Sequence, residues 1–105
     1  MIELRKRFKR KGVEFTQLYK DENIVIYMTD INSLEIFRYR IAKPDITCDE
    51  EHEHYPSDSH FGSWAWCATS LSSFRRILEK HFTHNCDIDK IYDYICAILN
   101  TYLPR

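Results

Sequence analysis

The strongest constraint on the fold is the stretch 60–82, where a strand pattern passes directly into a helix pattern. Within residues 63–69, Trp64, Trp66 and Ala68 alternate with small residues, which is the two-residue period of a pleated strand. An indole buries roughly 150–250 Å² when it is packed. We therefore predict a strand at about 63–69 whose two tryptophans share one face, and we expect a helix to lie across that face.

Two amphipathic helices are predicted after this strand. The first runs over about 70–83, because Thr69 or Ser70 can accept hydrogen bonds from the free N–H groups of the first turn. The second runs over about 87–102 and begins after Asp87, another favourable N-cap. In both segments apolar side chains recur at spacings of three and four residues. They are Leu71, Phe74, Ile77, Leu78, His81 and Phe82, and then Ile88, Ile91, Tyr92, Ile95, Leu99, Tyr102 and Leu103.

The apolar stripe of the second helix is wider than one small sheet needs, because Tyr94, Cys96 and Ile98 extend it. Packing within the fold accounts for this width most simply. The alternatives are a groove between the sheet and the first helix, or a self-association surface such as that of a homodimer.

Four further strands are predicted in the first part of the chain. Alternating residues indicate strands at about 13–20, 23–29 and 34–41, and the polar turns between them predict an antiparallel meander. The basic start, at about 2–9, also alternates and precedes a turn at Gly12. This start is therefore either an edge strand or a disordered arm.

An acidic loop over about 44–60 separates these strands from the tryptophan strand, and we expect it to cross the surface. Because the strands precede the helices without alternating with them, the order predicts an α+β fold. We expect an antiparallel sheet of four to five strands, packed on one face by the two C-terminal helices. A chain of 105 residues supports one core, so a single domain over 1–105 is predicted.

Composition favours a globular, cytoplasmic protein. Apolar residues make up 44% of the chain, and only two glycines and three prolines leave little room for flexible linkers. No apolar run approaches the roughly twenty residues of a membrane span, and charges stand where a signal peptide has its apolar core. The four cysteines have no C-x-x-C spacing, which fits free thiols in a reducing compartment. We therefore expect a cytoplasmic location and no membrane contact.

Several short motifs follow one another between residues 24 and 82: Glu35-Ile36-Phe37, Pro56-Ser57, Phe61-Gly62 and Ala65-Trp66. In this respect the chain resembles short uncharacterised proteins of anaerobic gut bacteria, their phages and mobile elements. In those proteins a strand of the YEVF kind leads through an acidic loop to a PS-x-x-x-FG-x-x-AW motif and a helix. The resemblance implies the fold of this region and no activity, and it includes neither the loop histidines nor the last helix.

Zinc is the cofactor for which the sequence offers the most specific set of candidate ligands. His81 and His84 are three residues apart, hence on one helix face, and Cys86 lies just beyond them. Three more histidines stand in or next to the acidic loop, at 52, 54 and 60, but they keep no fixed register to this pair. We expect exposed histidines with no metal and no other cofactor, and keep His81, His84 and Cys86 as an alternative zinc site.

Catalytic motifs do not emerge from the sequence, which contains neither a glycine-rich phosphate loop nor a nucleophile elbow. Cys67 and His60 are an alternative thiolate–imidazole pair, although a strand cysteine opposite two tryptophans is more typical of a core. We therefore expect no enzymatic activity and no catalytic residues.

The uneven charge distribution makes nucleic-acid binding the main alternative function. Residues 1–12 carry six basic side chains and one acid, whereas residues 44–58 carry six acids and no Lys or Arg. The basic candidates for phosphate contacts are Arg5, Lys6, Arg7, Lys9, Arg10 and Lys11. If the two segments face each other, this positive charge is neutralised within the fold. The rest of the chain, with nine basic and fifteen acidic groups, repels a polyanion.

A protein-interaction module is the function that we expect first, either self-associating or bound to another protein, as an accessory protein of a phage or mobile element. Tyr55, Phe61 and Trp64 stand close to the acidic loop and are the candidate partner-binding residues, because aromatic side chains are enriched at interface hot spots. The same three side chains can instead anchor the loop to the core. A protein partner or a second copy is favoured over nucleic acid.

Overall fold

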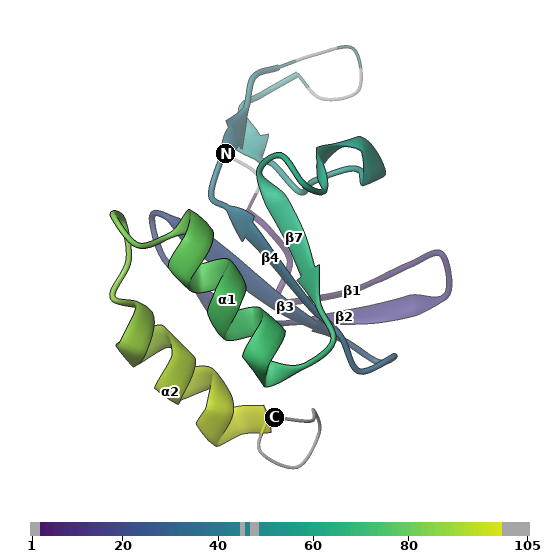
Figure 1. Cartoon of the computed structure of the whole chain (residues 1–105). Coiled ribbons are helices and arrows are strands. Elements are labelled where there is room, and N and C mark those ends of the chain that lie inside the picture. Colours follow the sequence, from purple (N-terminus) through teal and green to yellow (C-terminus); the bar gives the residue numbers. More distant parts are fainter. Residues whose placement is uncertain (1–2, 45, 47–48, 100–105) are drawn as a thin grey trace.

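The computed structural model describes residues 3–44, 46 and 49–99. A five-stranded antiparallel sheet forms its centre, and two helices follow the sheet in sequence (Figure 1). The strands, in spatial order, are β1 (Arg7–Arg10), β2 (Val13–Lys20), β3 (Ile24–Thr29), β4 (Leu34–Arg38) and β7 (Ala65–Ala68). The other elements are β5 (Ile41–Ala42) and β6 (His52–Glu53), which form a two-stranded sheet, the 3-10 helix η1 (Asp58–His60), α1 (Leu71–His81) and α2 (Ile88–Leu99). The predicted α+β fold is confirmed.

Local chemistry explains where the first strands turn. In the β1–β2 turn, Lys11 and Gly12 both have positive φ, 52° and 79°. Two such residues give a hairpin loop the twist that the flanking strands require. Between β2 and β3, Asp21 Oδ1 accepts the backbone N–H groups of Asn23 and Ile24, at 2.7 and 3.0 Å. The turns predicted at these two places are present.

Polar side chains cap both helices as predicted. Ser70 Oγ accepts the backbone N–H of Ser73 at 3.1 Å, and Asp87 Oδ1 accepts that of Lys90 at 3.2 Å. Each bond satisfies an N–H group that the first helical turn leaves without a partner. Helix α1 ends at His81, two residues before the predicted end. Residues 100–102 of the second predicted helix lie outside the described residues.

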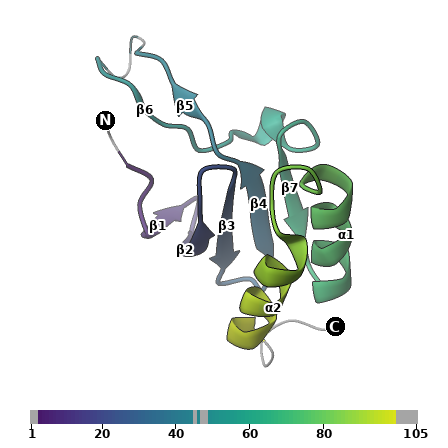
Figure 2. The same ribbon diagram turned by 90° about the vertical axis from the view of Figure 1, so that its left-hand side faces the viewer.

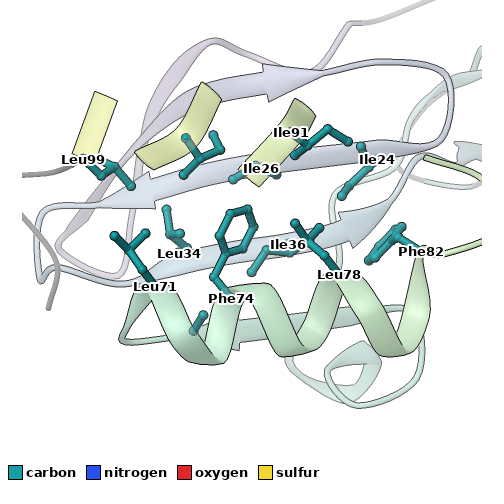
Figure 3. Packing of buried hydrophobic residues seen from close by; sticks show 12 residues of the cluster. Ile24, Ile26, Leu34, Ile36, Leu71, Phe74, Leu78, Phe82, Ile91 and Leu99 are labelled. Carbon is teal, nitrogen blue, oxygen red and sulfur yellow. The ribbon is translucent and has the colours of Figure 1, made fainter. Parts of the chain in front are cut away.

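Both helices pack on the same face of the sheet (Figure 2). Figure 3 shows Phe74 and Leu78 of α1 and Ile91 of α2 directed toward side chains of β3 and β4. We call this cluster the first core; it consists of Ile24, Ile26, Leu34, Ile36, Ala68, Leu71, Phe74, Leu78, Phe82, Ile91, Ile95 and Leu99. Burying a large apolar side chain stabilises a fold by roughly 1.5–3 kcal/mol, so this cluster holds the helices on the sheet.

The helices pack on one face of the sheet as predicted, and the opposite face is covered by other parts of the chain. The buried residues of this opposite face form what we call the second core: Phe15, Val25, Tyr27, Phe37, Trp64 and Ala65. Tyr55 and Phe61, from the segment after β6, pack against them. Strand β3 separates the two cores, since the consecutive residues 24–27 are all buried.

The two tryptophans lie in different cores, which corrects the prediction that they share a face. Trp66 packs against the first core and Trp64 is buried in the second. Strand β7 begins only at Ala65. Trp64 precedes it in a turn, where Gly62 N donates to Ala65 O at 2.7 Å and Trp64 N donates to His60 O at 3.2 Å. The strand alternation therefore does not reach Trp64.

Strand β4 ends at Arg38 and not at residue 41 as predicted. Arg38 pairs with Ile24, the first residue of β3, and Phe37 pairs with Ala65, the first residue of β7. Beyond these pairs the described part of the sheet offers no neighbouring strand. The chain leaves the sheet and forms the β5–β6 arm, so the predicted loop over 44–60 contains β6 and η1 (Figure 2).

A bulge in β2 changes which ring faces which core. The β2–β3 register shifts between Gln17 and Tyr19, so Tyr19 packs against the first core although Phe15 lies in the second. The β1–β2 pairing begins with Arg7, which lies opposite Thr16. The predicted strand over 2–9 is therefore shorter at its start.

In the described part of the chain, no helix has the length and apolarity to cross a membrane.

Candidate functional site

The three predicted partner-binding aromatics all lie against the second core. The ring of Tyr55 makes an edge contact with Phe37, with centroids 5.3 Å apart, and its hydroxyl donates to Glu35 Oε1 at 2.5 Å. Burial raises the pKa of both the Glu35 carboxyl and the Tyr55 hydroxyl. Trp64 is only 6% exposed and offers a partner little area, whereas Tyr55 and Phe61 are partly exposed.

Two histidines and an arginine surround Trp64. The rings of His54 and His60 lie 5.0 and 4.8 Å from the indole and 5.3 Å from each other. The Arg40 guanidinium lies over the same indole at 4.9 Å. Burial, followed by the nearby charges of His60, Arg40 and His52, lowers the pKa of His54. His60 Nδ1 accepts the Ser57 backbone N–H at 3.0 Å. The surroundings of His54 therefore favour its neutral form.

Acidification is expected to lower the stability of the fold through His54. Because the pKa of folded His54 lies below the ordinary value of 6.5, the unfolded chain takes up the proton first as the pH falls. The free energy of unfolding then decreases below about pH 6.5. Burial lowers the pKa of His81 too, so the melting temperature should fall between about pH 7.5 and 5, and should fall less in a His54→Gln variant. A variant whose pH profile parallels that of the wild type would contradict this role.

The basic start is held against the sheet by its backbone. Gln17 N–H donates to Lys6 O at 2.7 Å, and the Tyr27 hydroxyl donates to Arg5 O. Both acceptors precede β1, so the sheet holds the chain in place before the edge strand begins. Residues 3–11 are therefore docked on the sheet and are not a disordered arm.

The six basic candidates differ in whether an acidic side chain already neutralises their charge. Arg7 pairs with Glu14 at 2.7 Å, and Lys11 pairs with Asp58 of the acidic segment at 3.0 Å. The Arg10 guanidinium lies over the ring of Tyr55, in the same acidic segment, at 5.6 Å. Within the described residues the others, Arg5, Lys6 and Lys9, form no ion pair. The acidic segment thus neutralises only part of the basic start.

A cavity of about 310 Å³ lies beside β1. Its lining is formed by residues of the basic start together with two residues of the segment that begins at β6: Glu3, Leu4, Arg5, Phe8, Lys9, Arg10, Glu53 and Tyr55. Three of these are cations, and Phe8 and Tyr55 contribute aromatic surface. We call this the β1 cavity.

A buried ion pair closes one side of the β1 cavity. The Glu53 side chain is 2% exposed, and Lys20 Nζ lies 2.8 Å from its Oε1 and 2.6 Å from its Oε2. The Lys20 ammonium also lies over the Tyr39 ring at 5.5 Å. This pair joins the end of β2 to β6, and it holds the following segment, with Tyr55, against the second core.

The alternative zinc site is not assembled. In the part of the chain that the structure describes, no three His, Cys, Asp or Glu side chains are grouped so that they can hold a metal ion. His81 instead stacks on Trp66, with centroids 4.0 Å apart, while His84 is exposed. Cys86 packs against the first core, where burial raises the pKa of its thiol to about 11.

The alternative catalytic pair is equally unsupported by the structure. Cys67 lies beside Glu35 and Ser33, and burial, followed by the Glu35 charge, raises the pKa of its thiol. A nucleophilic cysteine needs the opposite shift, because the thiolate is the reactive form.

The outer surface of α2 carries exposed apolar side chains. Tyr94 is 48% exposed and Ile98 36% exposed, and they stand four residues apart on one helix. The ring of Tyr94 meets that of Tyr19 in β2 at 5.8 Å. Burial and the hydrogen bond to Asp21 raise the pKa of Tyr19 to about 12, so its hydroxyl remains neutral. We call Tyr19, Tyr94 and Ile98 the α2 patch.

Two features of this surface were not found from the sequence: the β1 cavity and the Lys20–Glu53 pair. Both depend on the position of β6, which is two residues long and lies within an acidic run that reads as a loop. The α2 patch, by contrast, had a signal in the width of the apolar stripe. Comparison of the chain with models of protein families, with curated proteins and with solved structures finds no match.

Proposed function

We propose that this protein is a cytoplasmic, non-enzymatic interaction module that self-associates through the α2 patch. The observation that carries the proposal is the exposure of Tyr94 and Ile98, two large apolar side chains one turn apart on the same helix. Such side chains, gathered on one element, are typical of an interface. An accessory role in a phage or mobile element, which the sequence resemblance suggests, is part of this proposal.

A second copy of the chain is the partner that fits this surface best. In a twofold dimer the same patch meets itself, so an apolar patch is complementary to its own copy. Tyr19 lies beneath Tyr94 and extends the patch onto the sheet, which adds an aromatic pair of the kind enriched in interface cores. The aromatics around Tyr55 are less suited, because their rings are already engaged in the second core.

Replacing Ile98 by aspartate is expected to abolish self-association, because the charge would be buried without a partner in the dimer. The molar mass in solution, measured by light scattering over a concentration series, should be that of a dimer for the wild type and of a monomer for the variant. Ile41→Asp is the matched control, since Ile41 is 49% exposed and lies on the β5–β6 arm.

The control should remain dimeric and keep the melting temperature of the wild type, and the Ile98 variant should still unfold cooperatively as a monomer. A wild type that is monomeric at all concentrations, or equal dissociation by both variants, would overturn the proposal. Tyr94→Asp provides a second variant for the same patch.

A further inference from the structure

We propose that the β1 cavity binds single-stranded nucleic acid, with one nucleotide entering the cavity and its phosphate meeting Arg5, Lys9 and Arg10. This site goes beyond the proposed self-association, because it lies in the basic start and the β6 segment rather than in α2. Its ligand is recognised by two properties together, a negative charge and an aromatic ring.

The charge of the cavity is the first argument. Arg5, Lys9 and Arg10 line it, whereas Arg7 and Lys11, which have acidic partners, do not. The two lining carboxylates do not cancel these charges. Glu53 is already paired with Lys20, which leaves Glu3 against three cations. An anion entering the cavity therefore meets a net positive lining.

Preorganisation is the second argument. The backbone oxygens of Arg5 and Lys6 accept hydrogen bonds from Tyr27 and Gln17, so the chain that presents Arg5 is fixed before any ligand binds. Arg10 is fixed as well, because it donates to Pro56 O at 3.3 Å and lies over the Tyr55 ring. Cations that are already in place lose little conformational freedom on binding.

The shape of the cavity selects a single strand. Its volume of about 310 Å³ is at the lower end of small-ligand pockets, roughly 300–1,000 Å³, and it admits a base but not a duplex. Phe8 and Tyr55 also line the cavity. Phe8 already stacks on Phe15 and Arg10 lies over the Tyr55 ring, so an entering base contacts the ring surface that these neighbours leave open. Outside residues 1–12 the chain has nine basic and fifteen acidic groups, which disfavours the long electrostatic contact that duplex DNA requires.

Fluorescence anisotropy with labelled ten-nucleotide oligo(dT) and oligo(U) tests the site directly. The wild type should bind at low salt, and its affinity should fall as the salt concentration rises. A double variant, Arg5→Ala with Lys9→Ala, should bind at least about tenfold more weakly and should show a smaller salt slope. A duplex of the same length should bind more weakly than the single strand.

The matched control removes the same charge outside the cavity. Arg7→Ala with Lys11→Ala should change the affinity by less than about threefold, although both pairs of variants lower the net charge by two. Glutamine replaces alanine at positions 5 and 9 if the first double variant melts earlier than the wild type. Absence of binding at low salt, or equal losses in both double variants, would overturn the proposal. Binding of free inorganic phosphate without any preference for the oligonucleotide would also overturn it.

Discussion

Replacing Phe37 by alanine is expected to lower the free energy of unfolding by about 3–5 kcal/mol, because it removes a whole ring from the second core. Phe37 is fully buried, and its ring meets those of Tyr27, Tyr55 and Trp64 at centroid distances of 6.0, 5.3 and 6.2 Å. These rings come from three separate parts of the chain. The cavity left by alanine therefore cannot be closed by moving one neighbour. Urea denaturation monitored by circular dichroism measures the loss.

Phe37→Leu is the control for this experiment, because leucine retains most of the apolar volume and should cost distinctly less. A loss below about 1 kcal/mol for the alanine variant would show that this face of the sheet is not a core. In that case Tyr55 and Phe61 would be free to leave the sheet. A full loss means that the segment after β6 is part of the folded unit, with its aromatic side chains used for packing.

The sequence predicts well the structural features that depend on interactions between residues close together in the chain. Alternation locates β2 and β4, and the turn at Gly12 and the caps at Ser70 and Asp87 follow from the chemistry of single side chains. Each of these features depends on neighbours within a few residues. Their energies are therefore encoded in short stretches, which a pattern can represent.

The second core has a sequence signal that alternation conceals. Strand β3 reads Ile24-Val25-Ile26-Tyr27, a continuous apolar run, and such a run indicates a strand that is buried on both faces. The position of Trp64 has no comparable signal. A local turn closed by Gly62 and Ala65 changes the face of Trp64. A register shift between Gln17 and Tyr19, which depends on the pairing of β2 with β3, changes the face of Tyr19.

The candidate sites also depend on contacts between residues that are far apart in sequence, which the sequence alone does not reveal. The sequence predicts six equivalent basic groups, and the structure divides them by partners that are distant in sequence, since Lys11 meets Asp58 whereas Arg5 and Lys9 line a cavity. Charge alone therefore does not identify which cations are available to a ligand. The residues of the alternative zinc site are separated for a related reason. His81, at the end of α1, stacks on the Trp66 ring of β7, and the described residues contain no group of three metal-binding side chains.

Replacing Lys20 by methionine is expected to lower the free energy of unfolding by about 3–5 kcal/mol at neutral pH, because it leaves the Glu53 carboxylate buried without a cation. The Glu53 side chain is 2% exposed, whereas that of Lys20 is 28% exposed. Urea denaturation at neutral pH measures the loss.

Two controls separate the buried charge from the loss of the lysine itself. Lys11→Met breaks the pair with Asp58, whose two side chains are 71% and 80% exposed, and should cost less than about 1 kcal/mol. Adding Glu53→Gln to Lys20→Met removes the unpaired charge and should recover much of the stability. If the double variant is as unstable as Lys20→Met, the cost lies in packing and not in charge. If it recovers, the ion pair is what holds β6 beside β2, and with it both the Tyr55 cover of the second core and the wall of the β1 cavity.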